Sequence, residues 1–200
     1  MKLAQRIVIA YYVRKFRLLS VISPTLAAKA AFNLFCTPYT NRKNYRIPKI
    51  FASAEKLSFD LDHYKINGFR WFPKDGNNGM KALICHGFDS YSYKFDRYVT
   101  PLLKSGFEVL AFDAPAHGTS TGKTINVNQY RKMIAIINGR FGPVDRIIAH
   151  SFGALAVALA VEDLPGSEKM KLVLIAPATE TTHAVETFFK HVPVTKKVSY

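Results

Sequence analysis

The stretch VDRIIAHSFGALAVALAV, residues 144–161, decides the fold. Residues 144–149 are mostly apolar and predict a short buried strand, and residues 154–161 are apolar on every side and predict a buried helix. Between them lies AHSFG, residues 149–153, which is a G-x-S-x-G pattern with alanine for the first glycine. Small residues on both sides of the serine let strand and helix approach closely at a sharp turn, so Ser151 is the candidate nucleophile. The alternative is a core serine that only caps the helix.

Apolar runs and amphipathic segments alternate around this stretch. Short apolar runs predict further strands over residues 81–85, 107–112 and 171–176. Apolar residues three or four apart predict two amphipathic helices between these strands, with apolar positions at Phe95, Tyr98, Val99, Leu102 and Leu103 and at Tyr130, Met133, Ile134, Ile137 and Phe141. Continuously apolar strands separated by helices indicate an α/β fold, a mostly parallel sheet with helices on both faces and functional groups at the carboxyl ends of its strands.

The domain is expected to begin with antiparallel strands. Apolar and polar residues alternate over residues 57–61, as they do in a half-buried strand. The dipeptide Asn67-Gly68, which is typical of tight turns, precedes Phe69 and Trp71. The sequence therefore predicts a β-hairpin that turns at Asn67-Gly68.

The loop after residues 81–85 reads His86-Gly87-Phe88 and lies where an oxyanion loop should be if Ser151 is a nucleophile. Acyl transfer develops negative charge on the carbonyl oxygen, and two preorganised backbone N–H groups can stabilise it. The expected donors are the N–H groups of Phe88 and Phe152. His86 itself is expected to brace the loop through a hydrogen bond rather than to transfer protons.

The loop after residues 107–112 reads DAPAHGTS, residues 113–120. Asp113 is expected to cap this polar loop. His117 is disfavoured as the general base because it precedes Ser151, whereas this architecture orders its triad as serine, acid, histidine. His150 adjoins the nucleophile, and adjacent side chains at a tight turn diverge, so a structural role is expected for it.

Three segments together resemble the α/β-hydrolase superfamily, in its branch of serine esterases, lipases and aminopeptidases. They are LICHGF (83–88), FDAPAHGTS (112–120) and IAHSFG (148–153), and the resemblance runs from about residue 57 to residue 178. It implies acyl-enzyme chemistry at Ser151, with a loop-supporting set consisting of His86, Gly87, Asp113, His117 and Gly153. Serine, imidazole and backbone amides suffice for acyl transfer, so no metal or organic cofactor is expected.

The same resemblance implies two further strands, bearing the acid and the catalytic histidine, after residue 176. Only 24 residues follow that position, and each strand–helix unit needs roughly 30. We therefore expect a chain truncated at its C-terminal end, with an apolar strand over residues 171–176 at the edge of the sheet. His183 and His191 lie in a segment that is expected to be an amphipathic helix at the start of a cap, and Glu180 is a weak candidate for the acid.

The net charge of +14 is concentrated at the N-terminus. The first fifty residues hold ten basic residues and no acidic one, which leaves 18 basic and 14 acidic residues in the remainder. We interpret residues 1–50 as a basic helical arm and residues 51–200 as the hydrolase domain. Over residues 18–36 two short helices are expected, the second capped by Ser23 and opened by Pro24. A mildly basic main body disfavours nucleic-acid binding.

The arm either packs on the domain or makes peripheral contact with anionic lipid through its basic residues and Tyr11, Tyr12 and Phe16. Cys36 and Cys85 lack metal-ligand spacing, and the absence of a glycosylation sequon agrees with a reducing cytoplasm. The expected function is hydrolysis of a small-molecule acyl substrate. An acyltransferase on the same residues, a lipase acting at a membrane, and a catalytically incomplete module that binds a ligand or a membrane surface are the alternatives.

Overall fold

The computed structural model describes residues 3–39, 46–179, 182 and 185–188. The chain forms two compact units. One unit comprises residues 38–178 and is an α/β unit; the smaller unit comprises residues 1–37 and 179–200, and its described part is helical. Each unit is described by itself.

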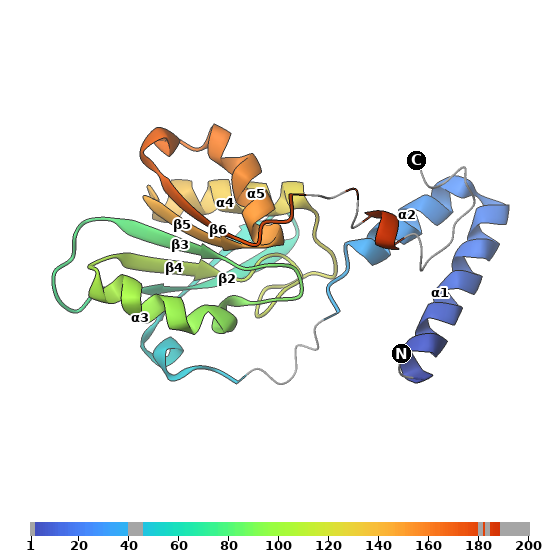
Figure 1. Cartoon of the computed structure of the whole chain (residues 1–200), viewed down its shortest axis with the longest axis horizontal. Coiled ribbons are helices and arrows are strands. Elements are labelled where there is room, and N and C mark those ends of the chain that lie inside the picture. Colours follow the sequence, from blue (N-terminus) through green and yellow to red (C-terminus); the bar gives the residue numbers. More distant parts are fainter. Residues whose placement is uncertain (1–2, 40–45, 180–181, 183–184, 189–200) are drawn as a thin grey trace. The chain divides into compact units, whose positions relative to one another are not determined.

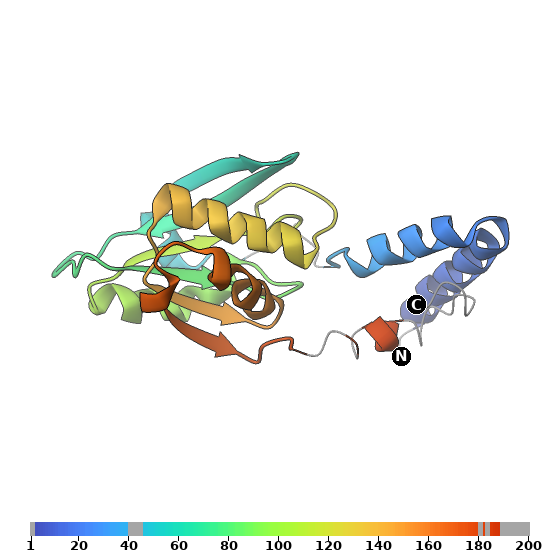
Figure 2. The same ribbon diagram turned by 90° about the horizontal axis from the view of Figure 1, so that it is seen from above.

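The α/β unit is built on a six-stranded sheet with the strand order β1-β2-β4-β3-β5-β6. The strands are β1 Glu55–Leu61, β2 Tyr64–Trp71, β3 Lys81–Cys85, β4 Glu108–Phe112, β5 Arg146–His150 and β6 Lys171–Ile175. β1, β2 and β4 pair antiparallel, whereas β4, β3, β5 and β6 pair parallel. Figure 2 shows the β1–β2 hairpin at one edge of the sheet and β6 at the other. The predicted fold class is confirmed, and so is the edge position of β6.

Helices cover both faces of the sheet (Figure 1). Helix α3, Asp96–Lys104, packs on one face, and helices α4, Val127–Phe141, and α5, Phe152–Ala160, pack on the other. The inner strands are buried on both sides, so their side chains alternate between two cores: Leu83 and Cys85 contact the α4–α5 layer and Ile84 contacts the α3 layer. Short 3-10 helices lie at Lys49–Ser53, Ser92–Phe95, Val161–Asp163 and Ser167–Lys169.

The first hairpin turns at Asp62-His63, and the expectation of a turn at Asn67-Gly68 is wrong. Asp62 has a φ of 52° between β1 and β2, while Asn67 and Gly68 lie inside β2. Gly68 faces Phe112 across the β2–β4 pair, and a Cβ at Gly68 would lie 2.2 Å from the Phe112 ring. Glycine is needed here because an aromatic ring lies on the backbone of the neighbouring strand.

Replacing Gly68 with alanine is expected to lower the free energy of unfolding by about 2 kcal/mol or more, because the buried Phe112 ring has no room to retreat. Gly139→Ala is the matched control. Gly139 lies in helix α4 with nothing within 4 Å of a new Cβ, so this variant should gain about 0.5–1 kcal/mol. Urea unfolding of the two variants measures both effects, and equal stabilities would contradict the steric argument.

The helical unit contains two helices, α1 Leu3–Ile22 and α2 Pro24–Phe35. The predicted cap is confirmed, because the Ser23 side chain accepts a hydrogen bond from Leu26 N–H and Pro24 opens α2. The first helix is longer than expected, since α1 continues through the basic residues 14–17 as a single element of 20 residues. Phe16, Ala27 and Ala31 are buried between the two helices. In the part of the chain that the structure describes, no helix is both long and apolar enough to cross a membrane.

The predicted helix that follows the sheet is described only in part. Residues 185–188 are helical, and Phe188 packs against Phe35 with ring centroids 5.4 Å apart. Glu180, His183 and His191 lie outside the described residues, so their proposed roles stay predictions.

Candidate active site

Ser151 occupies a sharp turn between strand β5 and helix α5. Its φ of 50° and ψ of −116° lie in a region that side-chain-bearing residues rarely adopt, which costs on the order of 1–3 kcal/mol. Neighbouring structure holds this conformation: Ser151 N–H donates to the Ile175 carbonyl of β6 (3.0 Å), and Ser151 C=O accepts from Ala154 N–H (3.0 Å). The side chain stays half-buried. Strained backbone at a strand-to-helix turn is the geometry that presents a nucleophile.

Small residues let the loop after β3 lie directly against this turn. A Cβ at Gly153 would lie 2.4 Å from the His86 carbonyl oxygen and 2.9 Å from that of Cys85. A Cβ at Gly87 would lie 2.7 Å from His150 Nδ1 and 3.2 Å from Ser151 Cβ. Gly87 and Gly153 therefore allow two backbone segments to meet at the candidate nucleophile.

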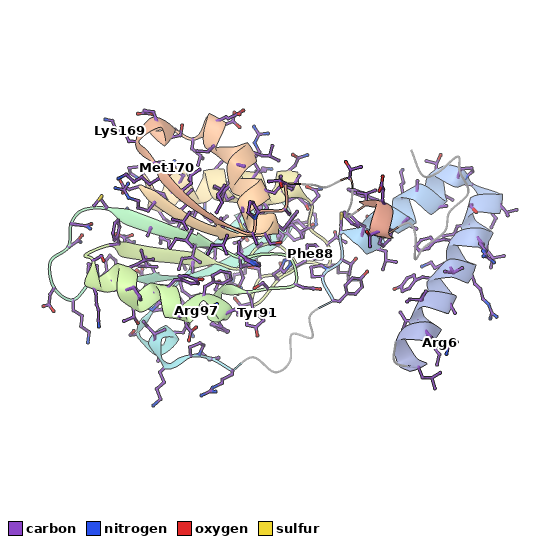
Figure 3. The ribbon with its side chains drawn as sticks, viewed as in Figure 1. Arg6, Phe88, Tyr91, Arg97, Lys169 and Met170 are labelled. Atoms are coloured by element: carbon purple, nitrogen blue, oxygen red, sulfur yellow. The ribbon has the colours of Figure 1, made fainter. Side chains whose placement is uncertain are left out.

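Phe152 and Phe88 lie on the two backbone segments that meet at this turn. Phe152 opens helix α5, where the first N–H groups have no intrahelical partner and the helix dipole is positive. Phe88 follows β3, and its ring packs edge-to-face on that of Phe152 with centroids 5.6 Å apart. Figure 3 places Phe88 at the carboxyl end of the parallel strands. Neither N–H donates a hydrogen bond to another described residue.

His86 connects this loop to the loop after β4. Its Nε2 accepts a hydrogen bond from Ala114 N–H (2.9 Å), so the ring hydrogen belongs on Nδ1, which donates to the Gly87 carbonyl (2.8 Å). The Tyr130 hydroxyl donates to the His86 carbonyl (3.0 Å). Both ring nitrogens are therefore engaged in bracing, and the ring is buried.

Asp113 closes the loop after β4 with four hydrogen bonds. Its Oδ1 accepts from the backbone N–H (2.8 Å) and the hydroxyl (2.7 Å) of Ser92, and its Oδ2 accepts from the backbone N–H and the hydroxyl of Thr119 (both 2.8 Å). Gly118, with a φ of 48°, passes so close that a Cβ there would lie 2.2 Å from the carboxylate. Each carboxylate oxygen of Asp113 thus accepts one hydrogen bond from a backbone N–H and one from a hydroxyl, so the buried side chain has hydrogen-bond partners on both oxygens.

The chain matches the family described as "Serine aminopeptidase, S33" over residues 78–199, which is more than half of its length. The chain belongs to this family. The resemblance to α/β-hydrolases is thereby confirmed. An uncharacterized hydrolase of Bacillus subtilis, YugF, is 25% identical over 123 residues, which are 58% of this chain and 45% of YugF.

Solved structures agree on the fold. A probable hydrolytic enzyme of Pseudomonas aeruginosa superposes with a TM-score of 0.57 at 21% identity, over 76% of this chain and 49% of that one. An esterase of Pyrococcus furiosus superposes with a TM-score of 0.53 at 23% identity, over 82% of this chain and 70% of that one. The S33-family chain spans less than half the length of the curated relatives it matches.

Two other histidines, His117 and His150, lie near the turn of this S33-family chain. His117 is buried, accepts a hydrogen bond from Asp89 N–H (3.2 Å) at Nε2 and donates from Nδ1 to the Pro115 carbonyl (2.9 Å). His150 lies on the α3 side, with its ring 6.2 Å from that of Phe95. The described residues hold no group of His, Cys, Asp or Glu that could bind a metal ion.

Sequence reasoning missed several residues that support the S33-family site. Ser92 and Tyr130 contact the two loops from segments far away in the sequence. Ser120 donates its hydroxyl hydrogen to the Asp113 carbonyl (2.6 Å) and accepts from Asn67 N–H (2.9 Å), which ties the loop to β2. Only Ser120 carried a signal, because it belongs to the DAPAHGTS segment; nothing near Ser92 or Tyr130 marks their roles.

The buried His86 makes the stability of the fold depend on pH. Burial is the main cause that lowers the pKa of His86 below its ordinary value near 6.5. The Asp113 carboxylate acts in the opposite direction, because it stabilises the protonated ring. Below that pH the unfolded histidine binds a proton and the folded one does not. The contribution of His86 to the free energy of unfolding should therefore be constant above about pH 7 and fall by up to about 1.4 kcal/mol per pH unit below about 6.5.

Urea unfolding between neutral and mildly acidic pH measures this slope. In the His86→Gln variant, the slope of the free energy of unfolding against pH should decrease by the contribution of about one proton. The His63→Gln variant changes an exposed histidine and should keep the slope of the parent chain. In a nuclear magnetic resonance titration of the unmodified chain, the His86 ring signal should not shift near pH 6.5. A normal titration of that signal would refute the assignment.

Proposed function

We propose that the protein is a serine hydrolase that cleaves a carboxylic ester or a related acyl bond through an acyl-enzyme at Ser151. The observation that carries this proposal is the strained, half-buried Ser151 at a strand-to-helix turn, where Phe152 opens the helix and the loop that contains Gly87 and Phe88 lies against the turn. Family membership and an esterase among the neighbours of the same fold support it.

In the proposed reaction, Ser151 Oγ attacks the acyl carbonyl carbon, and its proton passes through a general base to the leaving group. The N–H groups of Phe88 and Phe152 stabilise the negative charge on the carbonyl oxygen. Water then attacks the acyl-enzyme, which releases the acid and restores the hydroxyl. In the order of this architecture the base follows Ser151 in the chain, and the described residues do not include it.

Covalent capture tests the proposal. The native gene product is treated with a fluorophosphonate probe, and intact-mass measurement with peptide mapping should place one adduct on Ser151. Ser105→Ala is the matched control, because Ser105 is exposed at the end of α3; this variant should be labelled like the unmodified protein. Absence of an adduct, or an adduct that maps to another residue, would overturn the proposal.

A further inference from the structure

Helix α1 carries apolar side chains on two faces. The inner face packs against α2 through Phe16, with Tyr12 and Leu19 beside it. The outer face follows positions 3, 7, 11, 14, 18 and 21, which lie three or four residues apart and therefore form one stripe along the helix. Its apolar members are exposed by 59% at Tyr11 to 85% at Val21, and they comprise Leu3, Ile7, Tyr11, Leu18 and Val21.

Basic side chains border and interrupt the outer stripe. Arg6 and Arg17 lie along one side, Lys15 lies along the other, and Arg14 stands within it; all four are exposed. Figure 3 shows Arg6 near the beginning of α1. No acidic residue occurs in the first fifty positions, so nothing in this segment neutralises the cations. Ile7, Tyr11, Arg14 and Leu18 line one shallow hollow along the helix.

We propose that the outer face of α1 binds the surface of an anionic lipid bilayer, with the helix lying in the plane of the interface. An apolar stripe flanked by Lys and Arg is the pattern of interfacial helices, whose apolar side chains enter the headgroup boundary while the cations meet lipid phosphates. The long stem of Arg14 lets its guanidinium reach the headgroups from within the stripe. With four cations in 20 residues, α1 is suited to lie on a bilayer and not to cross it.

Charge distinguishes a membrane from a second copy of the chain as the occupant of this face. Two α1 helices meeting through their outer stripes would bring two sets of Arg6, Arg14, Lys15 and Arg17 together without a counter-charge. An anionic bilayer offers both an apolar acyl-chain region for the stripe and negatively charged headgroups for the cations. This inference goes beyond the proposed function, and it is tested on the Ser151→Ala chain, so loss of catalysis cannot affect the outcome.

Vesicle sedimentation tests the apolar part of the surface. Phosphatidylcholine vesicles are compared with mixed phosphatidylcholine–phosphatidylglycerol vesicles, and the chain should bind the mixed vesicles at least about tenfold more strongly. The double variant Ile7→Gln/Leu18→Gln should weaken that binding at least about tenfold, since two exposed apolar side chains no longer enter the interface. The matched control Leu159→Gln/Val173→Gln makes the same kind of change at exposed positions of the α/β unit and should bind normally.

The basic residues are tested separately. Arg14→Gln/Lys15→Gln should weaken binding to the mixed vesicles by about tenfold or more, and added salt should weaken binding of the unmodified chain. Lys56→Gln/Lys104→Gln removes the same charge from exposed positions of the α/β unit and should have little effect. All these positions are exposed, so the variants should unfold at the same temperature as the parent chain.

Three results would overturn the proposal. They are equal binding to neutral and mixed vesicles, unchanged binding of the Ile7→Gln/Leu18→Gln variant, and absence of binding to either vesicle. A dimer that gel filtration detects and that this double variant abolishes, together with absence of vesicle binding, would assign the face to a second copy of the chain instead.

Discussion

Replacing Ser151 with alanine is expected to lower the rate of ester hydrolysis by the native gene product about a thousandfold or more. In the proposed mechanism no acyl-enzyme can form without the hydroxyl, and only the proposed donors, the N–H groups of Phe88 and Phe152, and substrate binding would remain to assist water. The loss should appear in kcat with a p-nitrophenyl ester, because the nucleophile acts in the chemical step. Ser105→Ala should retain the full rate, since Ser105 is exposed outside the site.

A second substitution separates chemistry from folding at the same position. Ser151→Gly also removes the hydroxyl, but glycine adopts a φ of 50° without strain, so its free energy of unfolding should not fall below that of the parent chain. Both variants should be inactive, and the glycine variant should be the more stable of the two. Retained hydrolysis in either variant would exclude Ser151 as the nucleophile.

The sequence predicts the turn at Ser151 well because its causes are local. A buried strand, a buried helix and small residues at Ala149 and Gly153 leave few conformations for the residues between them. The hairpin at the start of the sheet was misplaced for the opposite reason. Asn67-Gly68 has the composition of a turn, yet Gly68 is required by Phe112, 44 positions later, whose ring lies against the backbone of β2.

The hydrogen bonds between the loops around the site could not be predicted either, because they join residues that are distant in the sequence. Asp113 is recognisable as a loop-forming residue, but its partner Ser92 lies 21 residues earlier, at the start of the short helix that leads into α3, and only the folded chain brings the two together. The length of α1 was underestimated because Arg14, Lys15 and Arg17 interrupt an apolar run. Long basic side chains favour a helix, so α1 continues through them.

Replacing Asp113 with asparagine is expected to lower the free energy of unfolding by about 3 kcal/mol or more. The change keeps the shape of the side chain and removes one acceptor. Ser92 and Thr119 hydroxyls can rotate to accept from the new NH2 group, but their backbone N–H groups cannot. Whichever way the amide turns, its NH2 group faces the backbone N–H of either Ser92 or Thr119, and that N–H loses its acceptor. The cost is largest at Ser92, because Ser92 is buried and water cannot replace the acceptor.

Asp145→Asn provides the matched control, because the Asp145 side chain accepts a hydrogen bond from Lys81 N–H (2.8 Å), and an amide can turn its oxygen to keep it. Its cost should stay below about 1 kcal/mol. The Asp113 loop also supplies the Ala114 N–H that holds His86 Nε2, and His86 in turn holds the loop of Phe88. Asp113→Asn should therefore slow labelling of Ser151 by the fluorophosphonate under conditions where the variant is still folded, whereas Asp145→Asn should not. Equal costs for the two substitutions would mean that the four hydrogen bonds of Asp113 do not hold the loop.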